Sequence, residues 1–360
     1  MGTKVTLKQI AEEAGVSLTT VHRVLNGKEG CSEEVRKRIL RIAKEHEYSV
    51  NLTASSLRRS TLNIALIFPE NEERSRYFLQ QMLNGYLKAR SELGNYNVVF
   101  QEFYMSVNQR GEFSAATYLK RIYRAQPVHF DGVILYNIDM DMEQLTWANR
   151  LIGSGIPIIC MERAPEGTED IPCVAVDDAL AADLASELMS KFVHNSGTVL
   201  LLNQSLRDGD QNGRIFRECL NARRDDLKIH AMDFDLLTDQ TDAITKLINE
   251  TPDLTGIYAT CARHTVSMLK ALNDRPGNYT VIGSELFDES YEALQNGTLD
   301  AVIDKRPEKI GYLALRLMME HLAKNVPLQT VYRVTPRIVL RANSNMYYKH
   351  KEESHYESDG

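Results

Sequence analysis

The sequence predicts a small all-α head followed by a two-lobed α/β core. Three observations lead to this expectation: two short amphipathic helices separated by Gly15, a basic N-terminal segment on an acidic chain, and apolar runs that alternate with helical periods from Leu62 onward. With 360 residues, 43% of them hydrophobic, the chain is long and apolar enough for two or three folded units with cores of their own.

The first two helices have the spacing of a helix-turn-helix, the motif that presents one helix to the DNA major groove. Thr6 and Gln9 form a capping-box start, Gly15 ends the first helix, and Ser17 can cap the second. The apolar positions of the second helix face a core that a third helix, starting near Ser32, completes. The remaining side chains of the second helix can reach DNA, and Arg23 among them suits a guanine edge.

Charge is distributed unevenly along the chain. Residues 1–60 contain eleven Lys and Arg against seven Glu, whereas the whole chain has a net charge of −7. A basic head on an acidic body fits attraction to DNA phosphates, which needs a local patch rather than a basic whole. Three amphipathic helices that merely cap a larger domain are the alternative. That alternative explains neither this asymmetry nor the Ala-Gly-Val-Ser-x-x-Thr-Val string that joins the two helices.

The segment Val5–Asn26 resembles the opening of the lactose-repressor (LacI/GalR) family, and the likeness continues through Asn51-x-x-Ala54-x-x-Leu57-Arg58. The resemblance implies a hinge helix over 51–59 that enters the minor groove, with Leu57 as an apolar wedge between base pairs. His22 departs from the family's usual Ser, and Val50 from its usual Pro. The DNA-contacting residues implied are Thr6, Ser17, Leu18, Thr19, Thr20, His22, Arg23, Asn26, Asn51, Ala54, Leu57 and Arg58.

The resemblance extends over residues 4–343 and implies a sugar-sensing core similar to periplasmic sugar-binding proteins. We expect a helix-turn-helix domain at 1–49, a hinge at 50–61, a core at 62–345 and a polar tail at 346–360. The first lobe is expected at about 62–164 and 305–323, and the second at about 165–304 and 324–345. Ligands of such sheets bind at the carboxyl ends of the strands, so the two lobes are expected to share one cleft.

Five residues are the effector-binding candidates that the resemblance places at this cleft. Arg214 falls where the family has an effector-gripping Arg, and Phe78 where an aromatic ring either stacks on a sugar or belongs to the core. Glu285 and Lys305 replace an Asp and a Gln, while Cys261 and Ala262 replace the family's Asn-Asp. Because one expected acid is missing and Lys305 joins Arg214 and Arg163 around the cleft, with Arg74 or Arg76 as a further candidate, we infer an acidic effector such as a uronate or a sugar phosphate. Alternatively, Lys305 pairs with Glu285 or Asp304 and only holds the lobes.

Other classes of protein have weaker support. The sequence has no apolar run of 18 residues and no secretory signal, so we expect a cytoplasmic protein with no membrane partner. It contains no nucleotide-binding glycine loop, nucleophile elbow or zinc-protease motif, and its five cysteines form no metal-binding pair, so neither catalysis, a metal nor a cofactor is expected. A sugar-binding transport protein is the rival hypothesis. The expected partners are a near-palindromic operator, a sugar or sugar-acid effector and a second copy of the chain.

Overall fold

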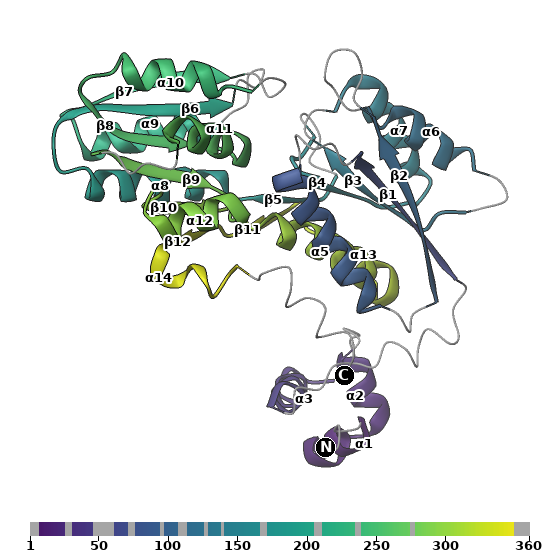
Figure 1. The fold of residues 1–360 in the computed structure, drawn as a ribbon. Coiled ribbons are helices and arrows are strands. Elements are labelled where there is room, and N and C mark those ends of the chain that lie inside the picture. The colour runs from purple at the N-terminus through teal and green to yellow at the C-terminus, as the bar shows by residue number, and fades with distance from the viewer. Residues whose placement is uncertain are drawn as a thin grey trace.

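The computed structural model describes residues 7–25, 31–45, 61–70, 76–93, 97–106, 114–125, 129–137, 140–165, 171–204, 211–234, 239–273 and 278–348. Within these ranges the chain forms a helical head and two α/β lobes, which lie side by side in Figure 1. The predicted fold class is therefore confirmed.

The head is built from three short helices around a small apolar core. Ile10, Val21 and Ile39, one from each helix, are fully buried in this core. Gly15 connects the first two helices with a φ of +64°, a conformation in which glycine avoids the strain that a side chain causes. The helices are α1 (Leu7–Ala14), α2 (Leu18–Leu25) and α3 (Glu33–Glu45).

The first lobe contains a six-stranded sheet in the order β11-β5-β4-β3-β1-β2, and every neighbouring pair in it is parallel. Its strands are β1 (Leu62–Pro69), β2 (Val98–Met105), β3 (Gly132–Asn137), β4 (Ile158–Glu162), β5 (Cys173–Val176) and β11 (Val331–Val334). Its helices are the π-helical η2 (Arg76–Gln80), α5 (Gln81–Ser91), α6 (Ala116–Tyr123), α7 (Met142–Gly153) and α13 (Pro307–Lys324).

The second lobe repeats this plan, with the order β12-β10-β9-β8-β6-β7, and differs in that β12 is antiparallel to β10. Its strands are β6 (Gly197–Gln204), β7 (Leu227–Phe234), β8 (Leu254–Ala259), β9 (Thr280–Ser284), β10 (Ala301–Asp304) and β12 (Arg337–Val339). Its helices are α8 (Asp178–Phe192), α9 (Gln211–Arg223), α10 (Thr241–Asn249), α11 (Ala262–Leu272), α12 (Asp288–Asn296) and α14 (Arg341–Ser344).

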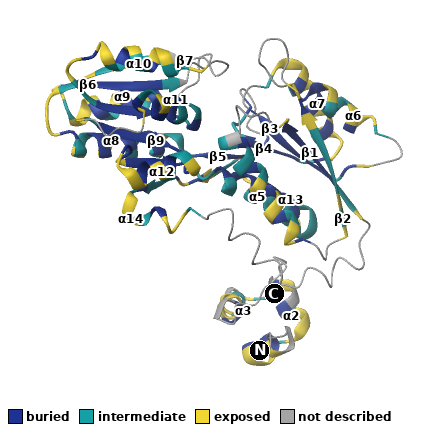
Figure 2. Ribbon diagram, viewed as in Figure 1, coloured by how far each residue is buried: buried dark blue, intermediate teal, exposed yellow. Residues whose placement is uncertain are grey.

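The central strands of both sheets are buried on both faces, as expected for parallel sheets covered by helices, while the outer strands are partly exposed (Figure 2). In the second lobe, alternate residues of one strand belong to two separate apolar clusters. Leu200 and Leu202 lie in one cluster, and Val199 and Leu201 in the other. Since successive side chains of a strand point to opposite faces, the near-continuous apolar runs in the sequence follow from this double burial.

The lobe boundaries that we expected from the sequence need correction. We expected the second lobe to begin near 165 and to include 324–345, but β5 and β11 both belong to the first sheet. Cys173 of β5 pairs in register with Cys160 of β4, so the chain leaves the first lobe only after β5. It returns between β10 and α13 and crosses for the last time between β11 and β12.

The C-terminal boundary also differs from the expected tail at 346–360. Tyr348 stacks on Tyr291 of α12 with ring centroids 4.1 Å apart, and its hydroxyl donates to Asp288 Oδ1 over 2.8 Å. Tyr347 lies under the Arg337 guanidinium, at 4.0 Å. Tyr348 thus packs on the second lobe through its half-buried ring, while Tyr347 stays exposed and contacts that lobe through Arg337.

Helices α5 and α13 approach each other closely in the first lobe. A Cβ atom placed on Gly85 would lie 1.8 Å from the backbone oxygen of Glu308, and one placed on Gly311 would lie 1.9 Å from that of Met82. Only glycine fits at these two positions. The close contact fixes α13, and with it the end of the crossover that begins at Lys305.

Candidate functional site

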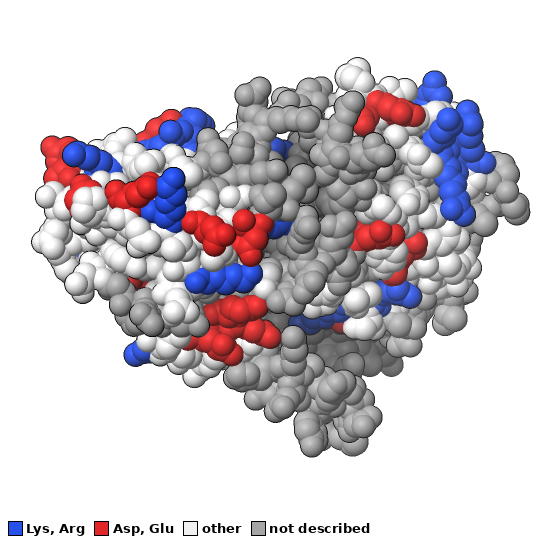
Figure 3. Space-filling view, turned by 45° about the horizontal axis from the view of Figure 1, so that its top comes forward, with Lys and Arg blue, Asp and Glu red and all other residues white. Residues whose placement is uncertain are grey.

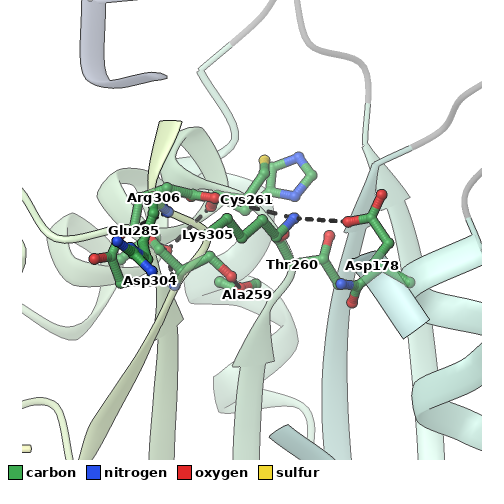
Figure 4. Close-up of polar contacts among 12 residues, drawn as sticks. Asp178, Ala259, Thr260, Cys261, Glu285, Asp304, Lys305 and Arg306 are labelled. Atoms are coloured by element: carbon green, nitrogen blue, oxygen red, sulfur yellow. Dashed lines mark hydrogen bonds and ion pairs between the residues drawn. The ribbon is translucent and has the colours of Figure 1, made fainter. Parts of the chain in front are cut away.

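Four charged residues from both lobes meet where strands of the two sheets end. Glu162 is the last residue of β4, Asp178 begins the helix after β5, Glu285 follows β9 and Lys305 follows β10. Figure 4 shows three of them, with the Lys305 side chain extending between Asp178 and Glu285. We call these four residues the interlobe cluster. The carboxyl ends of parallel strands are where α/β sheets bind ligands, so this cluster is the candidate effector site.

Lys305 is held by contacts within the protein. Its Nζ donates a hydrogen bond of 2.9 Å to the backbone oxygen of Thr260. The same atom lies 3.7 Å from Asp178 Oδ1 and 4.0 Å from Glu285 Oε1, and the side chain is 12% exposed. Burial lowers the pKa of Lys305, but the charges of Glu285 and Asp178 outweigh burial and leave this pKa above its usual value. The ammonium group therefore stays charged.

Glu285 is a buried carboxylate whose charge and hydrogen-bonding capacity are only partly satisfied by its neighbours. It is 1% exposed, and its Oε2 has no hydrogen-bond partner among the described residues. Burial raises the pKa of Glu285 well above its usual value, although Lys305 counteracts this. The residue has a φ of +61°, which is strained for a side chain of this kind. Buried polar atoms are normally hydrogen-bonded, so this oxygen is available to a ligand that donates a hydrogen bond.

Glu162 resembles Glu285 in its unused oxygen, its backbone conformation and its raised pKa, although the residue as a whole is only half-buried. Its Oε2 is buried without a partner, and its φ is +84°. Burial and the nearby charge of Asp178 raise the pKa of Glu162 to about 7, while Lys305 and Arg163 pull it down. The first lobe and the second lobe thus each contribute one strained glutamate with an unused acceptor. Backbone strain of this kind is found preferentially at functional sites.

Contacts outside the cluster also join the lobes. The Tyr77 hydroxyl donates to Glu289 Oε1 over 2.8 Å, and Gln81 Nε2 donates to the backbone oxygen of Leu286 over 3.0 Å. The Tyr77 and Phe287 rings lie 4.6 Å apart. Through these contacts η2 and α5 of the first lobe reach the loop between β9 and α12. This loop begins with Glu285, so one short segment carries both these interlobe contacts and a member of the cluster.

The structure brings together some of the predicted effector residues and leaves others apart. Glu285 and Lys305 are neighbours, and the Arg163 charge acts on the adjacent Glu162. Phe78 is partly buried against the first-lobe core. Arg214 pairs with Glu218 one turn along α9 at 2.8 Å, with both side chains more than half exposed. Neither Phe78 nor Arg214 contacts the interlobe cluster through a described hydrogen bond or ion pair, so their effector roles stay predictions.

Glu162 and Asp178 were missed as site residues by the sequence reasoning. Their position at the carboxyl end of a buried strand puts them at the edge where such sheets bind ligands, but the sequence does not show whether an acid there is buried or solvated. Lys305 has carboxylate partners within the protein, as the alternative interpretation expected. Asp304, the other partner considered for Lys305, instead pairs with Arg337 at 2.6 Å. The need of Lys305 for an anionic ligand, on which the acidic-effector hypothesis depended, is therefore met internally.

The predicted DNA-reading face lies on α2. Leu18 is 49% exposed, Thr19 and Arg23 are exposed, and Val21 and Val24 are buried on the opposite side. The Ser17 hydroxyl accepts a 3.1 Å hydrogen bond from the Thr20 backbone N–H, which starts the helix. The His22 side chain lies outside the described residues, as do Thr6, Asn26, Asn51, Ala54, Leu57 and Arg58.

Elsewhere the described surface offers one pronounced basic feature. Lys120, Arg124 and Arg150 surround the ring of Trp147 at 5.6, 5.5 and 4.5 Å, and Figure 3 shows basic side chains gathered on the first lobe. Among the described residues, no group of three or more His, Cys, Asp or Glu side chains has the arrangement of a metal site. No described helix is long and apolar enough to cross a membrane.

Two protein families match this chain in different regions. The periplasmic binding protein domain family matches residues 64–325, which include most of both lobes. The family described as bacterial regulatory proteins, lacI family, matches residues 6–51, which include the three helices of the head.

Individual relatives agree with this division. The HTH-type transcriptional regulator RegA of Clostridium acetobutylicum is 29% identical over 188 residues, 51% of this chain and 52% of that protein. Catabolite control protein A of Priestia megaterium is 23% identical over 352 residues, 94% of this chain and 99% of that protein. The solved structure of a transcriptional regulator CelR–cellobiose complex is 20% identical, with a TM-score of 0.58, and covers 93% of this chain and 98% of that chain. These relatives are named as regulators rather than enzymes.

Proposed function

Because the chain belongs to the lacI family of bacterial regulatory proteins and is a DNA-binding transcription regulator, we propose that a small sugar-like effector bound between its two lobes controls its affinity for an operator. One observation carries this proposal: a single chain joins a helix-turn-helix head to a two-lobed core whose unused buried acceptors lie between the lobes. A transport protein would use such a core but has no use for a DNA-binding head.

The DNA-binding part of the proposal assigns roles to α2. Leu18, Thr19 and Arg23 contact bases in the major groove, and the hinge residues predicted from 51–59 enter the minor groove. The chain acts as a homodimer on a near-palindromic operator, with one head on each half-site. It works in the cytoplasm, where the operator lies.

The effector part rests on the interlobe cluster. A CelR–cellobiose complex is known for a relative with this fold, and we extend the sugar class from that protein to this one. Hydroxyl or amine hydrogens of the effector reach the unused oxygens of Glu162 and Glu285. Since these residues come from different lobes, the effector favours one relative arrangement of the lobes. The lobes carry the hinge, so operator affinity changes when the effector binds the two states unequally.

The test begins with selection of operator DNA from random duplexes by the full-length protein. Arg23→Ala is expected to weaken binding of the selected duplex by about 5- to 100-fold, because a bidentate base contact contributes roughly 1–3 kcal/mol. Lys191→Ala, which removes an exposed cation from α8 in the core, is the control and leaves binding unchanged. Failure to enrich any sequence, with the protein folded, contradicts the proposal.

A further inference from the structure

We propose that the effector carries a protonated amino group, as amino sugars do, and that this group lies between Glu162 of the first lobe and Glu285 of the second. The inference rests on the proposed function, since it specifies the chemical class of ligand for the same site. It replaces the acidic effector that the sequence suggested.

The first argument is the pair of unused acceptors. Glu162 Oε2 and Glu285 Oε2 are both buried and accept no hydrogen bond from any described residue. The nearest cation to Glu285, Lys305 Nζ, lies 4.0 Å from Oε1, which is too far for a hydrogen bond. Two buried carboxylate oxygens in this condition are costly unless a ligand donates hydrogens to them.

The second argument is the charge balance at the cluster. Three carboxylates, those of Glu162, Asp178 and Glu285, face the ammonium group of Lys305. Arg163 is the other cation that acts on Glu162. With all three carboxylates ionised, one negative charge is left over, since Asp304 is neutralised by Arg337. In the free protein, bound protons relieve this excess, because burial raises the pKa of both Glu162 and Glu285. The positive charge of Arg263 lowers the pKa of the Cys261 thiol and that of the Tyr136 hydroxyl, and so counteracts the effect of burial on both groups. A ligand with one positive charge restores the balance, whereas a uronate or a sugar phosphate worsens it.

The third argument is the placement of the two glutamates on opposite lobes. The Glu162 charge raises the pKa of Glu285, so the two carboxylates are near enough to repel one another. A cation between them replaces this repulsion with attraction to both lobes. An ammonium group is therefore suited to stabilise the arrangement in which the lobes approach, which a neutral hydroxyl does less strongly.

Binding of an ammonium group is also expected to change the protonation of the Glu162 carboxyl. The pKa of Glu162 is about 7, so part of the free protein carries a proton on this carboxyl at neutral pH. A cationic ligand favours the ionised form and lowers that pKa, so binding releases protons. Affinity is then expected to fall as the pH is lowered through 7, because protonated Glu162 no longer attracts the ligand.

The experiment uses the full-length protein and matched sets of sugars. Glucosamine, galactosamine and mannosamine are compared with their parent hexoses, their N-acetyl derivatives and the corresponding uronates by titration calorimetry at pH 6.5, where the amino groups of these sugars are protonated before they bind. At least one amino sugar is expected to bind about tenfold or more tightly than its parent and its N-acetyl derivative, because a charged hydrogen bond is stronger than a neutral one. In buffers of different ionisation enthalpy, proton release accompanies binding.

Two isosteric substitutions sharpen the test. Glu162→Gln keeps the size and one acceptor but removes the charge, so it is expected to weaken binding of the amino sugar by about tenfold or more and to reduce proton release to the part that comes from Glu285. Glu285→Gln tests the other lobe, and its thermal unfolding is checked because Lys305 loses a partner. Glu187→Gln, on the exposed surface of α8, is the matched control and leaves both readouts unchanged.

The outcomes separate this inference from the proposed function. Tighter binding of a neutral sugar or a uronate than of its amino counterpart overturns the amino-group inference and leaves a sugar-responsive regulator. An amino sugar whose affinity is unaffected by Glu162→Gln also overturns it. If none of the sugars binds, the sugar effector itself is wrong, and this inference is overturned with it.

Discussion

The two lobes share one strand order but use it with different charges. Strand β4 in the first sheet occupies the position of β9 in the second, and each ends in a glutamate with positive φ, Glu162 or Glu285. The neighbouring strands, β5 and β10, are followed by opposite charges, those of Asp178 and Lys305. One scaffold thus places like charges at one pair of strand ends and opposite charges at the next. The balance between attraction and repulsion of the lobes depends on these few side chains.

The helices that cover equivalent faces differ as well. In the first lobe α5 and α13 meet backbone to backbone through Gly85 and Gly311. In the second lobe the equivalent pair, α9 and α8, packs through small residues of α8 such as Ala182, and Arg223 pairs with Asp183 at 2.7 Å. The first-lobe contact therefore tolerates no added atom, whereas the second has side chains that can adjust.

Charge over the surface follows the same division. Residues 177–304 contain 22 acidic and 11 basic side chains, while residues 61–176 and 305–334 together contain 16 of each. The negative charge of the chain thus lies mainly in the second lobe. Figure 3 shows a group of Lys and Arg side chains on the first lobe. DNA phosphates are attracted to the head and repelled by the second lobe, which favours contact through the head alone.

Removal of the cation between the lobes is the largest expected effect. Lys305→Met leaves Glu285 buried without a cation, and we expect a loss of about 3 kcal/mol in the free energy of unfolding at pH 8. The loss is smaller at pH 5, where Glu285 can take up a proton. Denaturant titration measures both values. Lys191→Met, at an exposed ion pair, is the control and changes stability by less than about 0.5 kcal/mol. Equal losses in the two variants contradict the role of Lys305.

An added methyl group between α5 and α13 is expected to have the next largest effect. Gly311→Ala places an atom 1.9 Å from a backbone oxygen, which forces the helices apart and costs about 2 kcal/mol. Gly153→Ala has nothing within 4 Å and is the matched control, with no loss. Thermal unfolding of the two variants decides the matter. If Gly311→Ala is as stable as the parent, the helix contact is looser than described.

The pH dependence of stability tests the glutamate of the first lobe. Burial raises the pKa of Glu162 from 4.5 to about 7, so the folded state binds this proton more tightly than the unfolded chain does. Stability of the ligand-free protein is therefore expected to fall by about 1–3 kcal/mol as the pH rises from 4.5 through 7. Denaturant titrations at several pH values measure this fall in stability, and Glu162→Gln is expected to remove the part that comes from Glu162. An unchanged slope shows that the carboxyl titrates normally.

The smallest effect is expected at the contact between η2 and α12. Tyr77→Phe removes the hydrogen bond to Glu289 and costs about 1 kcal/mol. Tyr312→Phe removes a hydrogen bond to Glu92 of the same 2.8 Å length, but within the first lobe. Only Tyr77→Phe is expected to change effector affinity, by up to about fivefold, since of these two bonds only the one made by Tyr77 joins the lobes. Equal effector affinities in the two variants contradict this coupling.

Sequence patterns predicted the architecture better than the site. Buried parallel strands leave continuous apolar runs, so Ile64–Phe68 and Thr198–Leu202 marked two sheets without any knowledge of pairing. The choice of sheet for short strands such as β5 was not predictable, because an apolar run of four residues pairs equally well with either sheet. Glu162 was not identified because an acid after a strand is normally solvated. Its pKa depends on burial and on the charges of Asp178 and Lys305, which are distant in sequence.

The sequence by itself determined the helix-turn-helix head, the two α/β lobes and the basic character of residues 1–60. These features depend on local periodicity and composition, which each segment carries independently of the others. Only the tertiary structure decided where the chain crosses between lobes, which carboxylates accompany Lys305 and which acceptors remain unused. Those properties depend on distances between segments far apart in the chain, and burial, charge pairing and pKa are set by such distances rather than by residue type.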